Sequence, residues 1–144
     1  VSDSFKVTRN YESGGAGLIG TVSSYSAIVQ AIACGGIGRK RILQEETVAL
    51  LSKPYTKGMQ QKDFSGTGKK GYAYGYGVRV LTDASTSRSP VGEFGWDGAA
   101  GAFNLVDPFN KVSITNAQHI MGFMDAYTVI HPTIRDLTYE ALGL

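Results

Sequence analysis

Glycine is frequent in this chain, and its placement limits the possible fold more than any other feature. Of the 144 residues, 19 are glycine. Glycine loses more backbone entropy on folding than other residues, so a folded chain keeps this many only where the backbone needs them. Such places are tight turns, positive φ angles and close approaches of two backbones. We therefore expect many β-turns, or a site in which backbone N–H groups face a ligand.

The other residues are those of one folded domain. Hydrophobic residues make up 42% of the chain and charged residues 18%, which is enough apolar material for a core. The length fits one domain and not two. The net charge of +2 is too small to neutralise several phosphates, so we expect no nucleic-acid partner. No apolar run approaches the roughly 20 residues of a membrane span, so we expect none.

Cysteine and histidine are too few for a metal site. Cys34 is the single cysteine, which excludes an intramolecular disulfide and a thiol-based zinc site. Because Cys34 falls on the last turn of an apolar helix, we expect a buried, inert thiol. His119 and His131 are the only histidines, and neither has a second histidine at metal-ligand spacing. We expect surface or strand-end histidines, no metal and no cofactor.

Apolar residues spaced three and four apart predict a helix that Thr21 caps and that Gly35 and Gly36 end. The apolar positions are Val22, Tyr25, Ile28, Val29 and Ile32. A shorter helix follows from Glu45 to Leu51, before Pro54. Lys53 to Lys70 has no period and is expected to be a long loop, which inside a domain is usually functional or mobile.

The second half of the chain alternates as strands do. Tyrosines and valines recur at every second position from Tyr72 to Val80, and strand segments are expected at Glu93–Trp96 and Ala102–Val106. Asp107 to Asn110 predicts a turn, and Lys111 to Asn116 predicts the return strand.

Pro132 fits the first turn of a last helix, whose expected apolar face is Ile134, Leu137, Tyr139 and Leu142. The coarse order is helix, helix, three antiparallel strands, helix. We therefore predict an α+β fold in which a three-stranded antiparallel sheet is packed by helices.

The stretch from Gly92 to Gly101 is the most informative for function. A strand with this many glycines is weak as a strand. One interpretation is that its backbone N–H groups pair with a substrate or point at a developing oxyanion. The other is a β-bulge that bends the strand. Composition favours neither.

This stretch resembles a known family of enzymes. Gly92 to Pro108 resembles the third conserved segment of the class C β-lactamase, esterase and D-aminopeptidase superfamily of serine hydrolases, whose strand carries a Lys-Thr-Gly, His-x-Gly or Trp-x-Gly element. Three earlier segments resemble that family in order and spacing. They are Glu12–Gly36 (ESGGAGLIGTVSSYSAIVQAIACGG), Arg41–Leu51 (RILQEETVALL) and Tyr74–Leu81 (YGYGVRVL).

The resemblance implies a role for four residues. Trp96, Asp97 and Gly98 fall where the family has its Trp-x-Gly element, which makes them the expected substrate strand. Trp96 takes the position of the residue that helps to orient the substrate and the catalytic base. The N–H of Ala99 is then one of two oxyanion-hole donors, and losing such a donor typically costs about 100- to 1000-fold in rate.

The family's nucleophile is not in this sequence. It lies in a Ser-x-x-Lys motif, in which the lysine one helical turn on activates the serine. No serine here has lysine at the third position. No Gly-x-Ser-x-Gly motif occurs either, and the family's Tyr-x-Asn is missing. We therefore expect no catalytic residue within the chain itself.

Taken together, the resemblance implies that residues 1–144 are a single partial domain, the carboxy-terminal portion of a β-lactamase- or transpeptidase-like fold. The parent would be a bacterial, penicillin-binding-protein-like serine hydrolase acting by acyl transfer on an ester, amide or β-lactam. This chain alone is expected to be inactive. The alternative is a binding or assembly module that keeps the scaffold without the chemistry.

The expected partners follow from the same resemblance. They are the missing amino-terminal half of the hydrolase or a second copy of this chain, with a small acyl compound as the parent's substrate. The compartment stays open between periplasmic, secreted and cytoplasmic, because any export signal would precede Val1.

Overall fold

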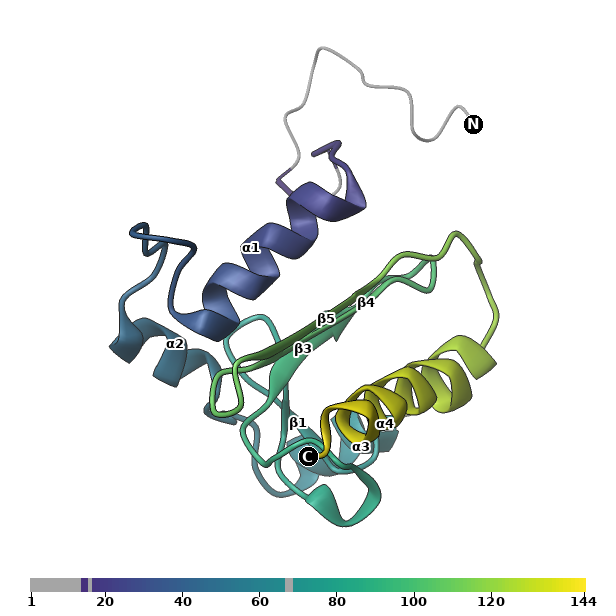
Figure 1. The fold of residues 1–144 in the computed structure, drawn as a ribbon. Coiled ribbons are helices and arrows are strands. Elements are labelled where there is room, and N and C mark those ends of the chain that lie inside the picture. Colours follow the sequence, from purple (N-terminus) through teal and green to yellow (C-terminus); the bar gives the residue numbers. More distant parts are fainter. Residues whose placement is uncertain (1–13, 16, 67–68) are drawn as a thin grey trace.

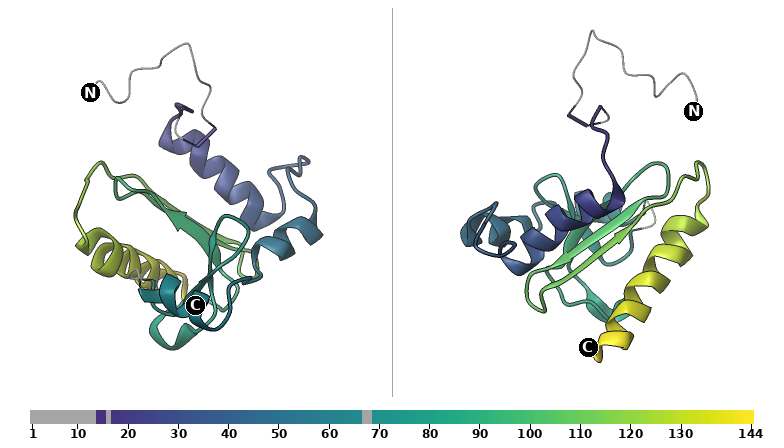
Figure 2. Two further views of the ribbon diagram at one scale, coloured as in Figure 1. Left: turned by 180° about the vertical axis from the view of Figure 1, so that it is seen from behind. Right: turned by 45° about the horizontal axis from the view of Figure 1, so that its top comes forward.

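The computed structural model describes residues 14–15, 17–66 and 69–144. In this part of the chain a five-stranded antiparallel sheet lies between α1 and α2 on one face and α4 on the other (Figure 1). Figure 2 shows the same layers from behind and with the top tilted forward. The helices are α1 (Val22–Cys34), α2 (Glu45–Leu51), α3 (Met59–Gly66) and α4 (His131–Leu142). The strands are β1 (Tyr72–Tyr74), β2 (Arg79–Leu81), β3 (Phe94–Asp97), β4 (Phe103–Asp107) and β5 (Val112–Asn116). A 3₁₀ turn, η2 (Ala84–Thr86), and a π-helical turn, η3 (Ala126–Ile130), complete the set.

Helix α1 begins and ends as the sequence predicts. The Thr21 hydroxyl accepts a hydrogen bond from the Ser24 N–H at 3.1 Å, and Gly35 ends the helix with a φ of 75°. Helix α2 also has the predicted bounds. Among the described residues, no helix combines the length and the apolar character that crossing a bilayer requires.

Helix α3 lies inside the stretch that we predicted to be a long loop, so that prediction is wrong over Met59–Gly66. The helix has no buried apolar stripe, so its sequence shows no apolar period. Contacts with β1 stabilise it instead. Phe64 packs on Tyr74 with ring centroids 5.5 Å apart. The Ser65 hydroxyl donates to the Tyr72 carbonyl at 2.8 Å.

The predicted three-stranded sheet is wrong, because the sheet has five strands in the order β1-β2-β3-β4-β5. Two glycine-containing turns account for the difference. Tyr72 to Val80 is a hairpin rather than one strand, because the Gly75 N–H donates to the Val78 carbonyl at 2.8 Å and Gly77 has a φ of 71°. Gly98 and Gly101 form a second turn between β3 and β4. Positive φ angles suit glycine, and Gly77 and Gly101 adopt them, so the two turns divide the strands instead of weakening them.

Each face of the sheet has its own apolar core. Val80, Phe94 and Val106 are neighbours on adjacent strands, and they pack with Val29 and Ala33 of α1 and Val48 of α2. On the opposite face Phe103, Leu105, Val112 and Ile114 pack with Tyr139 of α4. This alternation is the period of two that the sequence shows.

The carboxy-terminal helix forms as predicted, with Pro132 in its first turn, but its buried face differs. Ile134 and Tyr139 pack on the sheet, whereas Leu137 and Leu142 are 59% and 56% exposed. The buried positions are His131, Arg135 and Tyr139, spaced by four residues along one side of the helix. This face is polar because it covers a group of charged side chains under β3.

Candidate functional site

The predicted substrate strand lies at the end of β3, where the sheet is open on one side. Trp96 and Asp97 pair with Asn104 and Phe103 of β4. On the other side, the ladder between β2 and β3 joins Arg79 and Val80 to Gly95 and Phe94 and does not extend to Trp96. Within residues 14–15, 17–66 and 69–144, the backbone edge of Trp96 and Asp97 that faces β2 therefore has no strand partner. An edge of this kind can pair with an extended ligand.

Trp96 is partly exposed and stands among aromatic rings. Its side chain is on the sheet face that α1 covers, in register with Asn104. The Tyr74 ring meets it edge-on at 5.6 Å and the Phe64 ring stacks at 6.4 Å. The Lys69 ammonium lies 5.6 Å from its ring centroid. The indole is therefore held in place with 37% of the residue exposed.

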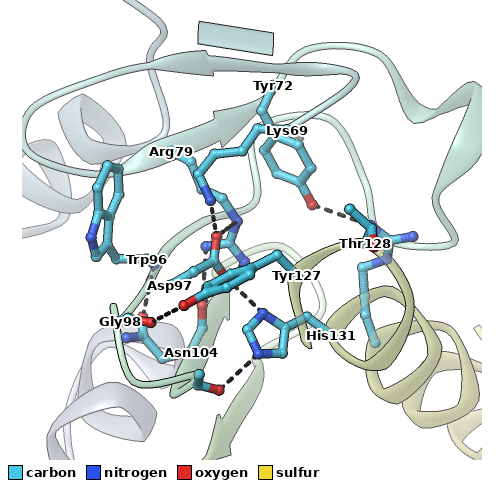
Figure 3. Close-up of polar contacts among 12 residues, drawn as sticks. Lys69, Tyr72, Arg79, Trp96, Asp97, Gly98, Asn104, Tyr127, Thr128 and His131 are labelled. Carbon is cyan, nitrogen blue, oxygen red and sulfur yellow. Dashed lines mark hydrogen bonds and ion pairs between the residues drawn. The ribbon is translucent and has the colours of Figure 1, made fainter. Parts of the chain in front are cut away.

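Asp97 points the opposite way and joins a buried group of charges. Its side chain is 7% exposed and pairs with the ammonium of Lys69. The Arg79 Nε lies 3.7 Å from its Oδ2 and the His131 Nδ1 lies 3.4 Å from its Oδ1. Figure 3 shows these three side chains converging on the carboxylate. We call Lys69, Arg79, Asp97 and His131 the Asp97 cluster.

The cluster stabilises the ionised form of Asp97. Burial by itself raises the pKa of a carboxyl group. Here the hydrogen bond from His131 and the positive charges of Arg79 and Lys69 outweigh burial, so the pKa of Asp97 is well below its usual range. Glu93, which is fully buried, is a second acidic side chain near Arg79. For Glu93 burial dominates and raises the pKa.

Gly95 makes this packing possible. The Arg79 Nη1 and Nη2 both donate to the Asn104 carbonyl at 3.2 Å. A Cβ at position 95 would lie 2.1 Å from that carbonyl oxygen and 2.7 Å from the Arg79 Nη1. Glycine is thus required at the place where the guanidinium crosses the strand. This is the close approach that the glycine content predicted.

The loop from Gly98 to Gly101 is held by the carboxy-terminal segment. The Tyr127 hydroxyl lies 2.9 Å from the Gly98 carbonyl and 3.0 Å from the Ala99 carbonyl. The His131 Nε2 lies 2.8 Å from the Gly101 carbonyl, and because a carbonyl only accepts, this nitrogen is the donor. Figure 3 shows the Tyr127 hydroxyl turned toward Gly98.

Ala99 follows the strand as an exposed loop residue. Within the described part of the chain its N–H donates no hydrogen bond. A neighbouring cavity of about 390 Å³ lies on the α4 side of the strand. Lys69, Arg79, Asp97, Tyr127 and His131 line it.

Several of these residues were missed from the sequence. Lys69, Arg79 and Tyr127 carry no motif, and a buried His131 at 3% exposure contradicts the expected surface or strand-end position. A four-residue spacing of Tyr127 and His131 near the start of a helix was the available signal. Cys34 is exposed, so the expected buried thiol is also wrong. Among the described residues no group of three or more His, Cys, Asp or Glu side chains could hold a metal ion.

Comparisons with known proteins identify a structural neighbour. No family model and no curated protein matches the chain. Among solved structures, the chain is similar to "EstCE1, a hydrolase with promiscuous acyltransferase activity", with a TM-score of 0.73 and 27% sequence identity. The match covers 94% of this chain and 34% of EstCE1, so the chain spans about a third of that protein's length. The fold is therefore hydrolase-like.

Proposed function

We propose that this chain is the carboxy-terminal part of a β-lactamase-like serine hydrolase and supplies its substrate and oxyanion strand. The parent enzyme acts by acyl transfer on an ester, amide or β-lactam. The observation that carries the proposal is that, among the described residues, the N–H of Ala99 donates no hydrogen bond and the adjacent edge of β3 has no strand partner. This N–H is at the position that the family resemblance assigns to the oxyanion donor. The structural similarity to EstCE1, which its name describes as a hydrolase, supports the same proposal.

Each residue of the strand has a role in this proposal. The serine of the parent attacks the acyl carbonyl, and negative charge develops on its oxygen. The Ala99 N–H donates to this oxygen, and a preorganised donor of this kind lowers the barrier without reorganisation. Trp96 forms an apolar wall beside the acyl group. Asp97 and Gly98 continue the backbone edge on which the substrate lies.

The nucleophile comes from a part of the enzyme that this chain does not contain. An exposed apolar surface on and before α1 is the place at which we propose that this part docks. It consists of Leu18, Ile19, Val22, Tyr25 and Ile28, and we call it the α1 apolar surface. Leu18 and Ile19 are each 85% exposed. Exposed apolar groups that gather on one surface usually mark an interaction site.

The α1 apolar surface and the candidate strand are adjacent. The Tyr25 hydroxyl accepts a hydrogen bond from the Asn104 side chain at 3.2 Å, and the Asn104 carboxamide oxygen accepts from the Trp96 N–H at 3.2 Å. A domain seated on α1 would therefore reach Trp96 and Ala99. EstCE1 is about three times as long as the region that matches this chain, which leaves room for such a domain.

A fluorophosphonate probe, which labels activated serines, tests the proposal. We expect no labelling of this chain and labelling of a serine outside it when the full parent polypeptide is used. Covalent labelling within residues 1–144 would contradict the proposal. So would a full-length protein without any labelled serine.

The role of Ala99 is tested in the full-length protein with Ala99→Pro, which removes the N–H. We expect kcat to fall about 100- to 1000-fold, the usual cost of one lost oxyanion donor. Ala117→Pro is the matched control, because Ala117 is exposed in a loop after β5 and its N–H donates no hydrogen bond among the described residues. Circular dichroism verifies that both variants fold. Equal activity of the two variants would contradict the role of Ala99.

A further inference from the structure

The loop between β3 and β4 has every one of its carbonyl groups engaged. The Gly98 and Ala99 carbonyls face the Tyr127 hydroxyl. The Ala100 carbonyl accepts from the Ile120 N–H at 2.9 Å, and the Gly101 carbonyl accepts from His131. These three donors from outside the loop lie in the segment from Ile120 to His131, which comes after the sheet in the sequence. Within the loop, the Gly101 N–H also donates to the Gly98 carbonyl at 3.0 Å, and the Gly98 N–H donates to the Ala102 carbonyl at 2.8 Å. A loop rich in glycine and alanine is thereby fixed both from outside and by its own hydrogen bonds.

Fixing the carbonyls also fixes the N–H groups of the loop. In a planar trans peptide the C=O of one residue and the N–H of the next point in opposite directions. Because the Gly98 carbonyl is turned toward Tyr127, the Ala99 N–H is turned away from it. The same holds for the Ala99 carbonyl and the Ala100 N–H. The Tyr127 hydroxyl, together with the Gly101 N–H that also donates to the Gly98 carbonyl at 3.0 Å, therefore sets the direction of two consecutive N–H groups.

The local backbone around Tyr127 is unusual in a way that favours this contact. Tyr127 lies in the π-helical turn η3, Ala126–Ile130, directly before α4. Such turns are rare and often occur at functional sites. The rings of Tyr127 and His131 are 5.3 Å apart and meet edge-on. Phe103 stacks on His131 at 4.8 Å, so both side chains are held against the loop.

We infer that Tyr127 is a positioning residue that aims the Ala99 N–H at the substrate oxyanion. The inference rests on the proposed function, because it assigns to Ala99 the role given above. Tyr127 acts through the backbone and does not touch the substrate itself. His131 and Ile120 hold the far end of the same loop. The carboxy-terminal segment thus contacts the carbonyl groups of the loop and thereby determines where the Ala99 N–H, which points away from that segment, is directed.

The structural part of the inference is tested in this chain by NMR with Tyr127→Phe, which keeps the ring contact with His131. We expect the Gly98 and Ala99 carbonyl carbons to shift upfield. The Gly101 and Ile120 amides should exchange about 5-fold faster, as the loss of one ordinary hydrogen bond implies. Thr128→Val is the matched control, because the Thr128 hydroxyl donates to Met124 within its own turn. Unchanged carbonyl shifts and exchange rates in Tyr127→Phe would overturn the inference.

A second replacement covers the case in which Tyr127→Phe does not fold. A difluorotyrosine placed at position 127 keeps the ring and the hydroxyl but makes the hydroxyl a stronger donor. At a pH low enough to keep this more acidic phenol protonated, we expect the Gly98 and Ala99 carbonyl carbons to shift in the direction opposite to that of a lost bond. No shift would overturn the inference as well.

The catalytic part is measured in the full-length protein. Tyr127→Phe should lower kcat about 10-fold with KM unchanged, because a donor that is free to turn is less well preorganised. Thr128→Val should keep both values. If Ala99→Pro is fully active, the proposed function fails whatever Tyr127 does. If Ala99→Pro is impaired and Tyr127→Phe is not, the proposed function stands and the positioning role is overturned.

Discussion

At the scale of single residues, Asp97 illustrates how a motif position can carry a structural role. The family resemblance places it inside the substrate strand, whereas its side chain lies in the buried cluster with Lys69, Arg79 and His131. A carboxylate in that position compensates three cationic or potentially cationic groups. We therefore expect Asp97 to hold β3 against α4 while its backbone serves the substrate edge.

Replacing Asp97 with Asn should destabilise the fold and remove a pH dependence. At pH 7 we expect a loss of about 3–5 kcal/mol in the free energy of unfolding, the usual cost of breaking a buried pair. Because the folded-state pKa of Asp97 is lowered, its contribution is present above its unfolded pKa of about 3.9. That contribution is lost as the pH falls below this value toward the folded pKa.

Urea titrations of the wild type and of Asp97→Asn at several pH values check this expectation. The difference between the two should be largest at neutral pH and should shrink below about pH 4. Asp63→Asn on α3 is the control, because Asp63 is exposed and such changes usually stay within about 0.5 kcal/mol. A pH-independent difference between the wild type and Asp97→Asn would contradict the assigned electrostatic role.

At the scale of elements, β3 requires a residue without a side chain at position 95. Gly95 lies where the Arg79 guanidinium reaches the Asn104 carbonyl across the strand. An added Cβ would be 2.1 Å from a backbone oxygen that cannot rotate away. The overlap must therefore be relieved by moving β4 or by expelling Arg79 from its buried position.

We accordingly expect Gly95→Ala to lower the free energy of unfolding by about 3 kcal/mol, the upper range for overpacking in a core. Gly20→Ala is the matched control, because a Cβ there meets nothing within 4 Å. Thermal unfolding followed by circular dichroism measures both. Equal melting temperatures of the two variants would show that β3 does not need the close approach.

The elements also show which part of the fold the sequence could predict. Helix α1 and the β4–β5 hairpin could be predicted because Thr21, Gly35 and Pro108 act on their own neighbours. The strand count could not, since whether Gly75 and Gly77 weaken a strand or turn it depends on its pairing partner. Helix α3 was missed because its stability comes from Phe64 and Ser65 on β1.

The candidate site also contains residues that could be predicted from the sequence and residues that could not. Trp96 to Ala99 could be named from a local motif, and the structure places Trp96 and Asp97 at the end of β3 and Gly98 and Ala99 in the loop that follows. Lys69, Arg79, Tyr127 and His131 lie up to 62 residues apart in the sequence, and only the fold brings them together. A long-range hydrogen bond such as that from Tyr127 to Gly98 leaves no periodic signal in one sequence.

At the scale of the whole molecule, the apolar side chains are unevenly distributed. Two cores fill the faces of the sheet, yet Val22, Tyr25 and Ile28 of α1 remain about half exposed. A helix that covers a sheet normally turns its apolar stripe inward. Here the stripe is wide enough to serve the sheet and a second surface, which is the arrangement expected if another domain packs on α1.

Replacing Ile28 with Ser tests this arrangement. Ile28 is 53% exposed, so the change should alter the stability of this chain by less than about 1 kcal/mol. If a second domain docks on α1, the same change also removes an apolar contact between Ile28 and that domain. In the longer hydrolase that we propose, we expect a clearly larger loss of stability, of about 1–3 kcal/mol. Leu137→Ser on α4 is the control, because Leu137 is equally exposed at 59% on the other face of the sheet.

Size-exclusion chromatography of this chain alone completes the comparison. If the chain is instead an assembly module, it should form a dimer, and Ile28→Ser should convert that dimer into a monomer. In that case any longer protein that contains the chain should lose no more stability from Ile28→Ser than the chain alone. If α1 receives the rest of a hydrolase, the chain should bind a dye for apolar surfaces, Ile28→Ser should reduce that binding, and Leu137→Ser should not. Equal effects of the two replacements in both proteins would mean that the α1 apolar surface has no partner.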